Sequence, residues 1–305
     1  MTAGTGAGDF EQLRPHLVAV AYRLTGTVAD AEDVVQDAWL RWEAHRETAI
    51  DDLAAWLTTV VSRLSLDRLR SAARRREMYA GQWLPEPVVT TVDGDDPLAA
   101  VVAGEDARFA AMVVLERLTP DQRVAFVLHD GFAMPFSEIA EVLGATPGAA
   151  RQLASRARRA VAGASKPADE HAEVVGKLLA AMASGDVAAV VELLHPEVTF
   201  TGDANRRAPT APQVIRGSDK VTRFLFGLAR RYGPRLFEVA APCLVNGELG
   251  LFTAGAAAND EWPAIAPRIQ AMTVSDGRVV AIYDIANPDK FTGSPLGRDL
   301  VTRLG

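Results

Sequence analysis

The apolar residues of this chain change their spacing once, and that change limits the folds available to it. Up to about residue 164 they recur every three or four positions, which is the spacing of one face of an α-helix. After residue 236 they form short runs on either side of Asn246-Gly247 and Asp276-Gly277, the strongest two-residue signals for a β-hairpin. At 305 residues the chain is long enough for two or three domains. The sequence therefore predicts a multidomain protein that is all-α at first and α+β at its end.

The expected elements divide the chain into four parts. Helical patterns predict a three-helix bundle in residues 1–80, a stretch rich in Pro and acids predicts a linker over 81–104, and helices return over 105–165. The last part, 169–305, begins with helices and ends in antiparallel strands. Outside 105–165, the expected helices are at about 9–24, 28–45, 51–77, 169–183, 186–194 and 218–232, and the expected strands are at 198–200, 237–244, 249–253, 269–274 and 279–285.

Composition excludes several classes of protein. The single cysteine, Cys243, excludes an internal disulfide and a cysteine-rich zinc site, and it suits a reducing compartment. No uninterrupted apolar run reaches the ~18 residues of a membrane span. The first residues, MTAGTGAGDFEQ, lack the basic and then apolar pattern of an export signal. We therefore expect a cytoplasmic protein that has no membrane contact, no metal and no cofactor.

Charges are sorted along the chain although the net charge is −7. Acidic residues gather at 30–37, whereas arginines gather at 63–76 and at 151–159. Local patches, rather than totals, determine binding to phosphate. The pattern indicates an acidic surface for one partner and basic surfaces for nucleic acid.

The clearest local motif is FSEIAEVLGATPGAARQLASRARRAV at 136–161. Gly144 supplies a turn between two helices, Thr146 is a good N-cap, and Pro147 fits the first helical position. The second helix presents small and basic residues outward, which is typical of a helix-turn-helix. Arginine and glutamine side chains read base edges with paired hydrogen bonds, and the later arginines suit phosphates.

Two blocks of sequence resemble a known family. VADAEDVVQDAWLRW followed by AWLTTVVSRLSLDRLRSAARR is similar to region 2 of an extracytoplasmic function sigma factor, and LTPDQRVAFVLHDGFAMPFSEIAEVLGATPGAARQLASRARR is similar to region 4. WLPEP at 83–87 and NPDKF at 287–291 resemble the subgroup that carries a C-terminal SnoaL-like domain. The resemblance implies a region 2 three-helix bundle, a region 4 helix-turn-helix, and an α+β cone with a curved antiparallel sheet.

The resemblance also implies a function. A sigma factor is not an enzyme; it binds core RNA polymerase, through the β′ clamp helices and the β flap, and directs initiation at promoter DNA. The implied polymerase-binding residues are Asp30, Asp33, Gln36 and Asp37. The implied DNA-binding residues are Arg63, Arg68, Arg70, Arg74 and Arg75 at the minus-ten element, and Ala149, Arg151, Gln152, Ser155, Arg156 and Arg159 at the minus-thirty-five element.

SnoaL-like domains resemble polyketide cyclases and ketosteroid isomerases, whose pockets hold an acid or base. The candidates in this chain are His195, Asp203 and Asp284, and we expect none of them to be catalytic. His195 is expected to cap a helix end, Asp203 to form a loop ion pair with Arg206 or Arg207, and Asp284 to end a strand. A small-molecule ligand of this domain stays open.

Trp83 is the unusual residue of the linker. An indole left in water forfeits roughly 2 kcal/mol of burial, so we expect it to dock. The preferred partner is the C-terminal domain, which would then regulate the sigma modules in cis; the alternative is packing against region 2 with no regulatory role. The expected contact joins Trp83, Leu84, Pro85, Glu86 and Pro87 to Asn287, Pro288, Asp289 and Lys290.

Two other functions fit the motifs. One is a stand-alone helix-turn-helix repressor with a ligand-sensing domain, which would dimerise on paired half-sites instead of binding polymerase. The other is a cyclase- or isomerase-like enzyme fused to a DNA-binding arm, which would lose turnover on replacement of Asp203 or His195.

Overall fold

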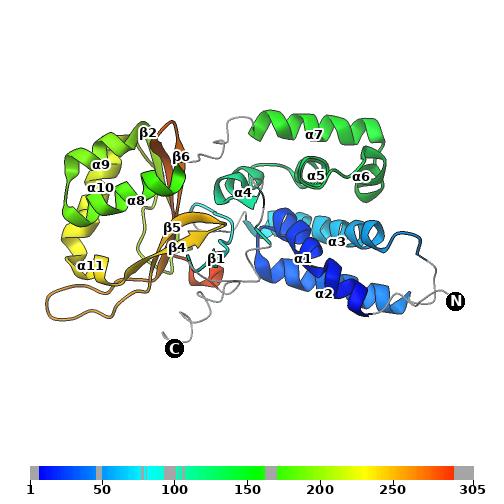
Figure 1. Cartoon of the computed structure of the whole chain (residues 1–305), viewed down its shortest axis with the longest axis horizontal. Coiled ribbons are helices and arrows are strands. Elements are labelled where there is room, and N and C mark those ends of the chain that lie inside the picture. Colours follow the sequence, from blue (N-terminus) through cyan, green and yellow to red (C-terminus); the bar gives the residue numbers. More distant parts are fainter. Residues whose placement is uncertain are drawn as a thin grey trace. The chain divides into compact units, whose positions relative to one another are not determined.

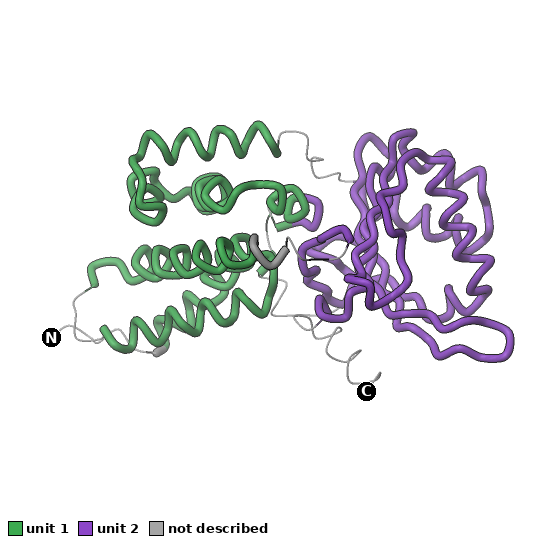
Figure 2. The backbone as a smooth tube through the Cα atoms, turned by 180° about the vertical axis from the view of Figure 1, so that it is seen from behind, with its two compact units in different colours: residues 1–78, 97–107, 111–164 green, residues 79–96, 108–110, 165–305 purple. Residues whose placement is uncertain are grey.

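The chain divides into two compact units, which Figure 2 colours separately. Unit 1 comprises residues 1–78, 97–107 and 111–164, and unit 2 comprises residues 79–96, 108–110 and 165–305. The structure is a computed structural model, and it describes residues 7–45, 50–76, 79, 81–92, 101–102, 104, 107–161 and 170–291.

The first three helices of unit 1 form a bundle. These helices, α1 (Ala7–Thr25), α2 (Val28–Ala44) and α3 (Leu53–Arg76), pack on one another pairwise (Figure 1). Their inward faces bury Leu17, Val34 and Val61. Thr27 begins α2, because its Oγ1 accepts a hydrogen bond from the Asp30 N–H at 3.1 Å. The predicted three-helix bundle is confirmed.

The remaining helices carry the predicted helix-turn-helix. The helix α6 (Phe136–Leu143) ends at Gly144, whose φ of +63° is left-handed, and α7 (Pro147–Val161) follows. Thr146 Oγ1 accepts from the Ala149 N–H at 3.2 Å, as expected of an N-cap. The helices before this pair are α4 (Phe109–Leu115), α5 (Pro120–Phe126) and the π-helical segment η3 (Val127–Gly131).

In its described residues, unit 2 is built on a seven-stranded sheet with the order β1-β4-β5-β6-β7-β2-β3. Neighbouring strands are antiparallel except β2 and β7, which run parallel, so the sheet is mixed instead of wholly antiparallel as expected. The strands are β1 (Val89–Thr90), β2 (Leu194–Asp203), β3 (Ile215–Arg216), β4 (Ala240–Val245), β5 (Glu248–Thr253), β6 (Arg268–Ser275) and β7 (Arg278–Ile285).

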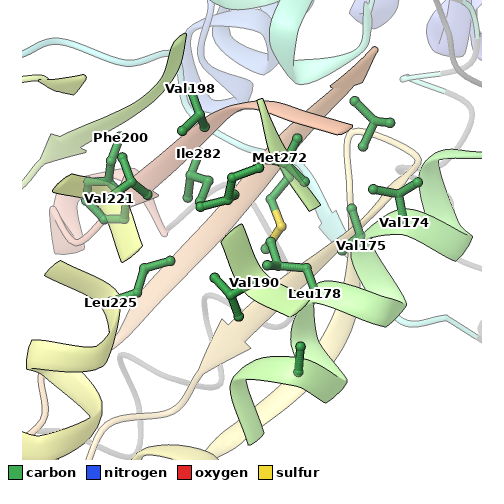
Figure 3. Packing of buried hydrophobic residues seen from close by; sticks show 14 of the residues in the cluster. Val174, Val175, Leu178, Val190, Val198, Phe200, Val221, Leu225, Met272 and Ile282 are labelled. Atoms are coloured by element: carbon green, nitrogen blue, oxygen red, sulfur yellow. The ribbon is translucent and has the colours of Figure 1, made fainter. Parts of the chain in front are cut away.

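Helices cover one face of this sheet and enclose the core of unit 2. Side chains from the helices meet those of β2, β6 and β7, among them Leu178, Phe200, Leu225, Met272 and Ile282 (Figure 3). The helical elements of this unit are α8 (His171–Ser184), α9 (Val187–Leu193), α10 (Ser218–Tyr232), α11 (Arg235–Glu238) and the 3₁₀ turn η4 (Pro288–Lys290).

The two hairpin signals are confirmed. Asn246 and Gly247 join β4 to β5 with φ of +50° and +81°, and Asp276 and Gly277 join β6 to β7 with φ of +50° and +71°. Two successive positive φ angles are what a two-residue turn of type I′ requires, and Asn-Gly and Asp-Gly adopt them readily.

Gly26 packs against a buried ion pair inside unit 1. Arg123 Nη1 lies 2.7 Å from Glu116 Oε1, and Arg123 Nε donates to the carbonyl oxygen of Arg23 in α1 at 2.9 Å. Gly26 has a φ of +83°, and a Cβ placed there would lie 2.5 Å from the Glu116 carboxylate. The glycine therefore satisfies two constraints, a left-handed backbone and close approach to the pair.

We expect Gly26→Ala to destabilise unit 1 by more than backbone strain alone. A left-handed non-glycine residue costs about 1–2 kcal/mol, and overpacking adds about 1–3 kcal/mol. The control is Gly144→Ala, which has φ of +63° but open space around its Cβ position. Guanidinium chloride unfolding followed by circular dichroism compares the two variants; equal losses of stability would show that the ion pair gives way freely.

Candidate functional site

An acidic face lies on α2. The acidic face is defined here as Asp30, Asp33, Gln36 and Asp37. Its residues are exposed or half-buried, whereas Val34, Val35 and Ala38 point into the bundle. Helical spacing separates the two sets, because residues three and four apart share a side of the helix. Leu40, which is 58% exposed, continues the same side by one turn. The result is a polar surface with one apolar residue at its end.

Arg68 of α3 reaches across to this acidic face. Its Nη1 lies 3.0 Å from Asp30 Oδ1 and 3.2 Å from Asp33 Oδ2, and its Nη2 lies 3.5 Å from Asp37 Oδ2. Partial burial acts to lower the pKa of Arg68, but hydrogen bonds to Asp30 and Asp33 outweigh it and raise the pKa. The sequence grouped Arg68 with the DNA-binding arginines; the structure brings it together with the acids.

The other arginines of α3 differ in their surroundings. Arg63 is exposed, and its Nη2 donates to the Glu141 carbonyl oxygen of α6 at 3.1 Å. Arg70 pairs with Asp121 of α5 at 3.0 Å, with both side chains nearly half exposed. An exposed ion pair such as that of Arg70 is worth about 0–1 kcal/mol, so Arg70 exchanges its partner at little cost. Arg74 and Arg75 lie in α3, and their side chains fall outside the described residues.

The outward side of α7 forms a recognition face. Ala150, Ala154 and Ala157 are buried, whereas the exposed residues recur at helical spacing. Exposed arginines of this face have contacts within the unit: the Arg151 guanidinium lies 5.6 Å from the Phe136 ring centroid, a cation–π contact, and Arg159 Nε donates to the Ser155 carbonyl oxygen at 3.4 Å. The recognition face comprises the exposed Arg151, Gln152, Ser155, Arg156 and Arg159 with the half-buried Ala149 at its edge.

In unit 2 the linker is held by a buried ion pair. Lys290 Nζ lies 2.6 Å from Asp203 Oδ2, with the two side chains 5% and 0% exposed. The Leu84 N–H donates to the same Asp203 oxygen at 2.8 Å, and Lys290 Nζ donates to the Leu84 carbonyl oxygen. Lys290 Nζ also lies 3.6 Å from the Trp83 ring centroid. The linker thus supplies a backbone donor, a backbone acceptor and an aromatic face to one charged pair.

Tyr79 and Asn287 complete this cluster. The Tyr79 hydroxyl donates to Asp203 and accepts from Asn287 Nδ2 at 3.0 Å. Burial, with a further contribution from Asp203, raises the pKa of Tyr79 well above its usual range, so the phenol stays protonated and donates. We call the whole set the linker clamp: Tyr79, Trp83, Leu84, Asp203, Asn287 and Lys290.

The segment between the two sigma-like modules is anchored on unit 2 at both ends. Beyond the linker clamp, Val88 exchanges two hydrogen bonds with Asn246, at 3.0 and 2.8 Å, and β1 pairs with β4. At the other end Arg108 lies 3.4 Å from Glu248, and the Phe109 ring lies 5.5 Å from that of Tyr283. Pro85, Glu86 and Pro87 between these contacts are buried as well.

The expectation for Asp203 was wrong. Asp203 is the last residue of β2, not a loop residue, because β2 pairs in parallel with β7 as far as Ile285. Its ion partner is Lys290, while Arg207 pairs with Asp289 at 3.5 Å on the surface. Sequence reasoning missed this role because a strand was expected only at 198–200, and residues 203 and 290 are far apart in the chain.

The three candidate catalytic residues do not converge. His195 lies near the start of β2, where its Nδ1 accepts from the Glu197 N–H at 3.1 Å, and Asp203 lies at the opposite end. Asp284 is fully buried and accepts from Thr210 Oγ1 at 2.7 Å and from Arg268 at 3.2 Å. Both carboxylates are thus held in separate polar clusters.

The described part of the chain holds neither a candidate metal-binding cluster nor a candidate membrane-spanning helix. Within it, His, Cys, Asp and Glu side chains form no group of three or more that could hold a metal ion. Among the helices in the same residues, none combines the length and apolarity needed to cross a membrane.

Comparisons with known proteins assign the chain. Models of Sigma-70 region 2, Sigma-70 region 4 and the SnoaL-like domain match residues 10–75, 108–161 and 175–287. The ECF RNA polymerase sigma factor SigJ of Mycobacterium tuberculosis is 68% identical over 293 residues, which is 94% of each chain. The chain is an extracytoplasmic function sigma factor.

Other relatives agree with this assignment. A crystal structure of SigJ from M. tuberculosis superposes with a TM-score of 0.86, at 66% identity, and covers 95% of this chain and all of that one. The probable sigma factor SigI from M. tuberculosis is 32% identical over 94% of both chains. This sigma factor therefore binds core RNA polymerase and promoter DNA in transcription initiation. The repressor and enzyme alternatives are set aside.

We expect Asp203→Asn to release the linker, because it removes the charge of the carboxylate that lies 2.6 Å from the buried Lys290 Nζ and accepts from the Leu84 N–H. Breaking one partner of a buried pair costs about 3–5 kcal/mol, so hydrogen exchange at the Leu84 amide rises by at least about tenfold. Asp289→Asn is the control, since its partner Arg207 is 56% exposed and such pairs contribute little. Unchanged exchange at Leu84 in Asp203→Asn would mean that the backbone contacts alone hold the segment.

Proposed function

We propose that the acidic face of α2 binds the β′ clamp helices of core polymerase in the cytoplasm, and that the region 4 module also contacts the β flap. Three carboxylates gathered on one exposed helix side favour a basic partner and speed its association. Gln36 adds hydrogen-bonding capacity, and Leu40 adds an apolar contact at the end of the face.

The arginine-bearing surfaces serve the promoter in this proposal. The recognition face of α7 enters the major groove at the minus-thirty-five element, with Arg151 and Gln152 able to read base edges. Arg63 and Arg70, with Arg74 and Arg75, serve the minus-ten element through phosphate contacts. Arg68 instead serves the acidic face, because its three ion contacts are made there.

The C-terminal domain, residues 169–305, regulates the region 2 and region 4 modules in cis. The observation that carries this proposal is the linker clamp, which ties the segment between region 2 and region 4 to unit 2 through the buried Lys290–Asp203 pair. Promoter elements lie at a set spacing, so a fixed connecting segment restricts which spacings both modules reach. The cavity within the same domain offers a place for a small-molecule input.

We expect Trp83→Ala to broaden the tolerance of the holoenzyme for promoter spacer length. The test is run-off transcription with core polymerase on a series of spacer lengths, built on a promoter identified by sequencing transcripts from a randomised template. Losing the indole weakens the hold on Lys290, and product from non-preferred spacers rises by about fivefold, the lower end of typical coupling between sites. Val92→Ala, an exposed residue of the same segment, is the control. An identical spacer profile in both variants would contradict the proposed regulation in cis, but it would not bear on the proposed binding to polymerase.

We expect Arg68→Gln to strengthen binding to core polymerase, because the acidic face loses its internal counter-ion. Three weak surface pairs are removed, and at the lower end of the scale, roughly 0.2 kcal/mol per exposed pair, they sum to about 0.6 kcal/mol, so the gain is at least about threefold. Asp33→Asn shifts affinity in the opposite direction, and Glu11→Gln, an exposed acid of α1, leaves it unchanged. Fluorescence anisotropy of labelled protein with core enzyme measures all three. Weaker polymerase binding by Arg68→Gln would indicate that Arg68 orients the carboxylates instead of masking them.

A further inference from the structure

The C-terminal domain holds a cavity of about 440 Å³ that lies between the sheet and helices α8, α10 and α11. This volume lies within the range of small-molecule sites, roughly 300–1,000 Å³. Its wall is mainly apolar; four of the lining side chains, Leu178, Leu225, Met272 and Ile282, are labelled in Figure 3. They belong to two helices and two strands of one unit, so the cavity is a property of that unit alone.

Polar groups gather at one part of this wall. Arg268 and Gln270 of β6 are two residues apart and share the cavity side of the sheet with Met272. Thr253 of β5 pairs directly with Arg268 in the strand register. The cavity therefore has a large apolar region and a compact polar end on the sheet, and Tyr232 of α10 is the other polar side chain among its described lining residues.

The polar end carries no net charge. Arg268 is the one charged residue among the described lining residues, and its Nη1 lies 3.2 Å from Asp284 Oδ2. Asp284 is fully buried and also accepts from Gln270 Nε2 at 3.2 Å. An incoming carboxylate would meet an arginine that is already neutralised and a second carboxylate close behind it. An incoming ammonium would meet Arg268 itself, and either ion would lose its hydration.

Hydrogen-bonding capacity nevertheless remains. Arg268 donates to Asp284, to the Pro209 carbonyl oxygen at 3.2 Å and to the Ala266 carbonyl oxygen at 3.4 Å. A guanidinium carries five N–H groups, so these contacts do not exhaust it. The Gln270 side chain donates to Asp284 through its nitrogen, which leaves its carbonyl oxygen as an acceptor.

We propose that this cavity binds a neutral, mainly apolar molecule whose single polar end, a carbonyl or hydroxyl group, lies against Arg268 and Gln270. The inference deepens the proposed function and rests on it in one respect, that the ligand is the input to regulation in cis. Few residues separate the polar end of the cavity from the linker clamp, because Asp284 of β7 precedes Asn287 and Lys290 of the clamp in the same stretch of chain.

Gly176 of α8 provides a way to close the cavity without disturbing the fold. It lines the cavity, and a Cβ placed on it would meet no atom within 4 Å. A larger side chain at this position therefore occupies the space that a ligand would take. Gly227 of α10 is also helical and equally open around its Cβ position, but it does not line the cavity, so it is the matched control.

The test compares three probes with the same number of carbons, 2-decanone, decanoate and decylammonium, by equilibrium dialysis against the full chain. We expect the ketone to bind at least tenfold more tightly than either ion. Gly176→Leu lowers its affinity at least tenfold, and Gly227→Leu leaves it unchanged. In Asp284→Asn the charge of Arg268 is no longer balanced, so the preference shifts at least tenfold toward decanoate.

Several results would overturn the proposal. They are equal or tighter binding of either ion to the unmodified chain, no binding of the ketone, or undiminished ketone binding in Gly176→Leu. Because dialysis uses neither polymerase nor promoter, its outcome is separate from the spacer profile of Trp83→Ala. If the chain regulates in cis but does not bind the ketone, only the ligand proposal is wrong. If the chain binds the ketone but Trp83→Ala leaves the spacer profile unchanged, only the regulatory role is wrong.

Discussion

The buried pair of Lys290 and Asp203 is the interaction on which the organisation of unit 2 depends. Removing an ammonium and a carboxylate from water is costly, and their attraction offsets that cost only when their remaining hydrogen bonds are satisfied. Here the linker provides the missing partners: the Leu84 N–H and carbonyl group, the Tyr79 hydroxyl and the Trp83 ring. Without the linker the pair would lose the Leu84, Tyr79 and Trp83 contacts. The C-terminal domain is therefore built to hold this segment of chain.

Unit 1 uses its charges in the opposite way. Arg68, Arg63 and Arg70 all have partners within the unit, but the side chains involved are partly exposed and the contacts are individually weak. In the function proposed above, promoter phosphates compete with such pairs for Arg63 and Arg70, and counter-ion release favours the phosphate contact. The surface pairs of unit 1 thus exchange for external partners at little cost, whereas the buried pair of unit 2 does not. The surface charges of unit 1 are suited to reversible binding of partners, whereas the buried pair of unit 2 is suited to retaining the linker.

Local signals predicted the elements whose geometry depends on neighbouring residues. Gly144, Thr146 and the Asn246-Gly247 turn were found because each satisfies a backbone requirement within a few positions. The clamp was only partly predictable: the sequence predicted that the linker docks near Asn287 to Lys290, but it did not indicate that Asp203 and Tyr79 take part. Asp203 was misplaced in a loop because its strand is stabilised by parallel pairing with β7, a partner some eighty residues away. The pairing of Arg68 likewise depends on how α2 and α3 pack, which spacing along one helix does not reveal.

The position of Asp284 relates the cavity to the clamp. Asp203 ends β2, and Asp284 is the last residue but one of the parallel neighbour β7, where it pairs with Gly202 in the register. One carboxylate faces Arg268 at the polar end of the cavity, and the other faces Lys290 beneath the linker. Both carboxylates belong to strands of the sheet and not to a loop. A shift of either one therefore strains the end of the neighbouring strand, because a close-packed interior transmits strain. In the proposal above, a ligand that strengthens or weakens the Arg268–Asp284 contact would therefore act one strand away from Asp203, whose carboxylate holds the Leu84 N–H.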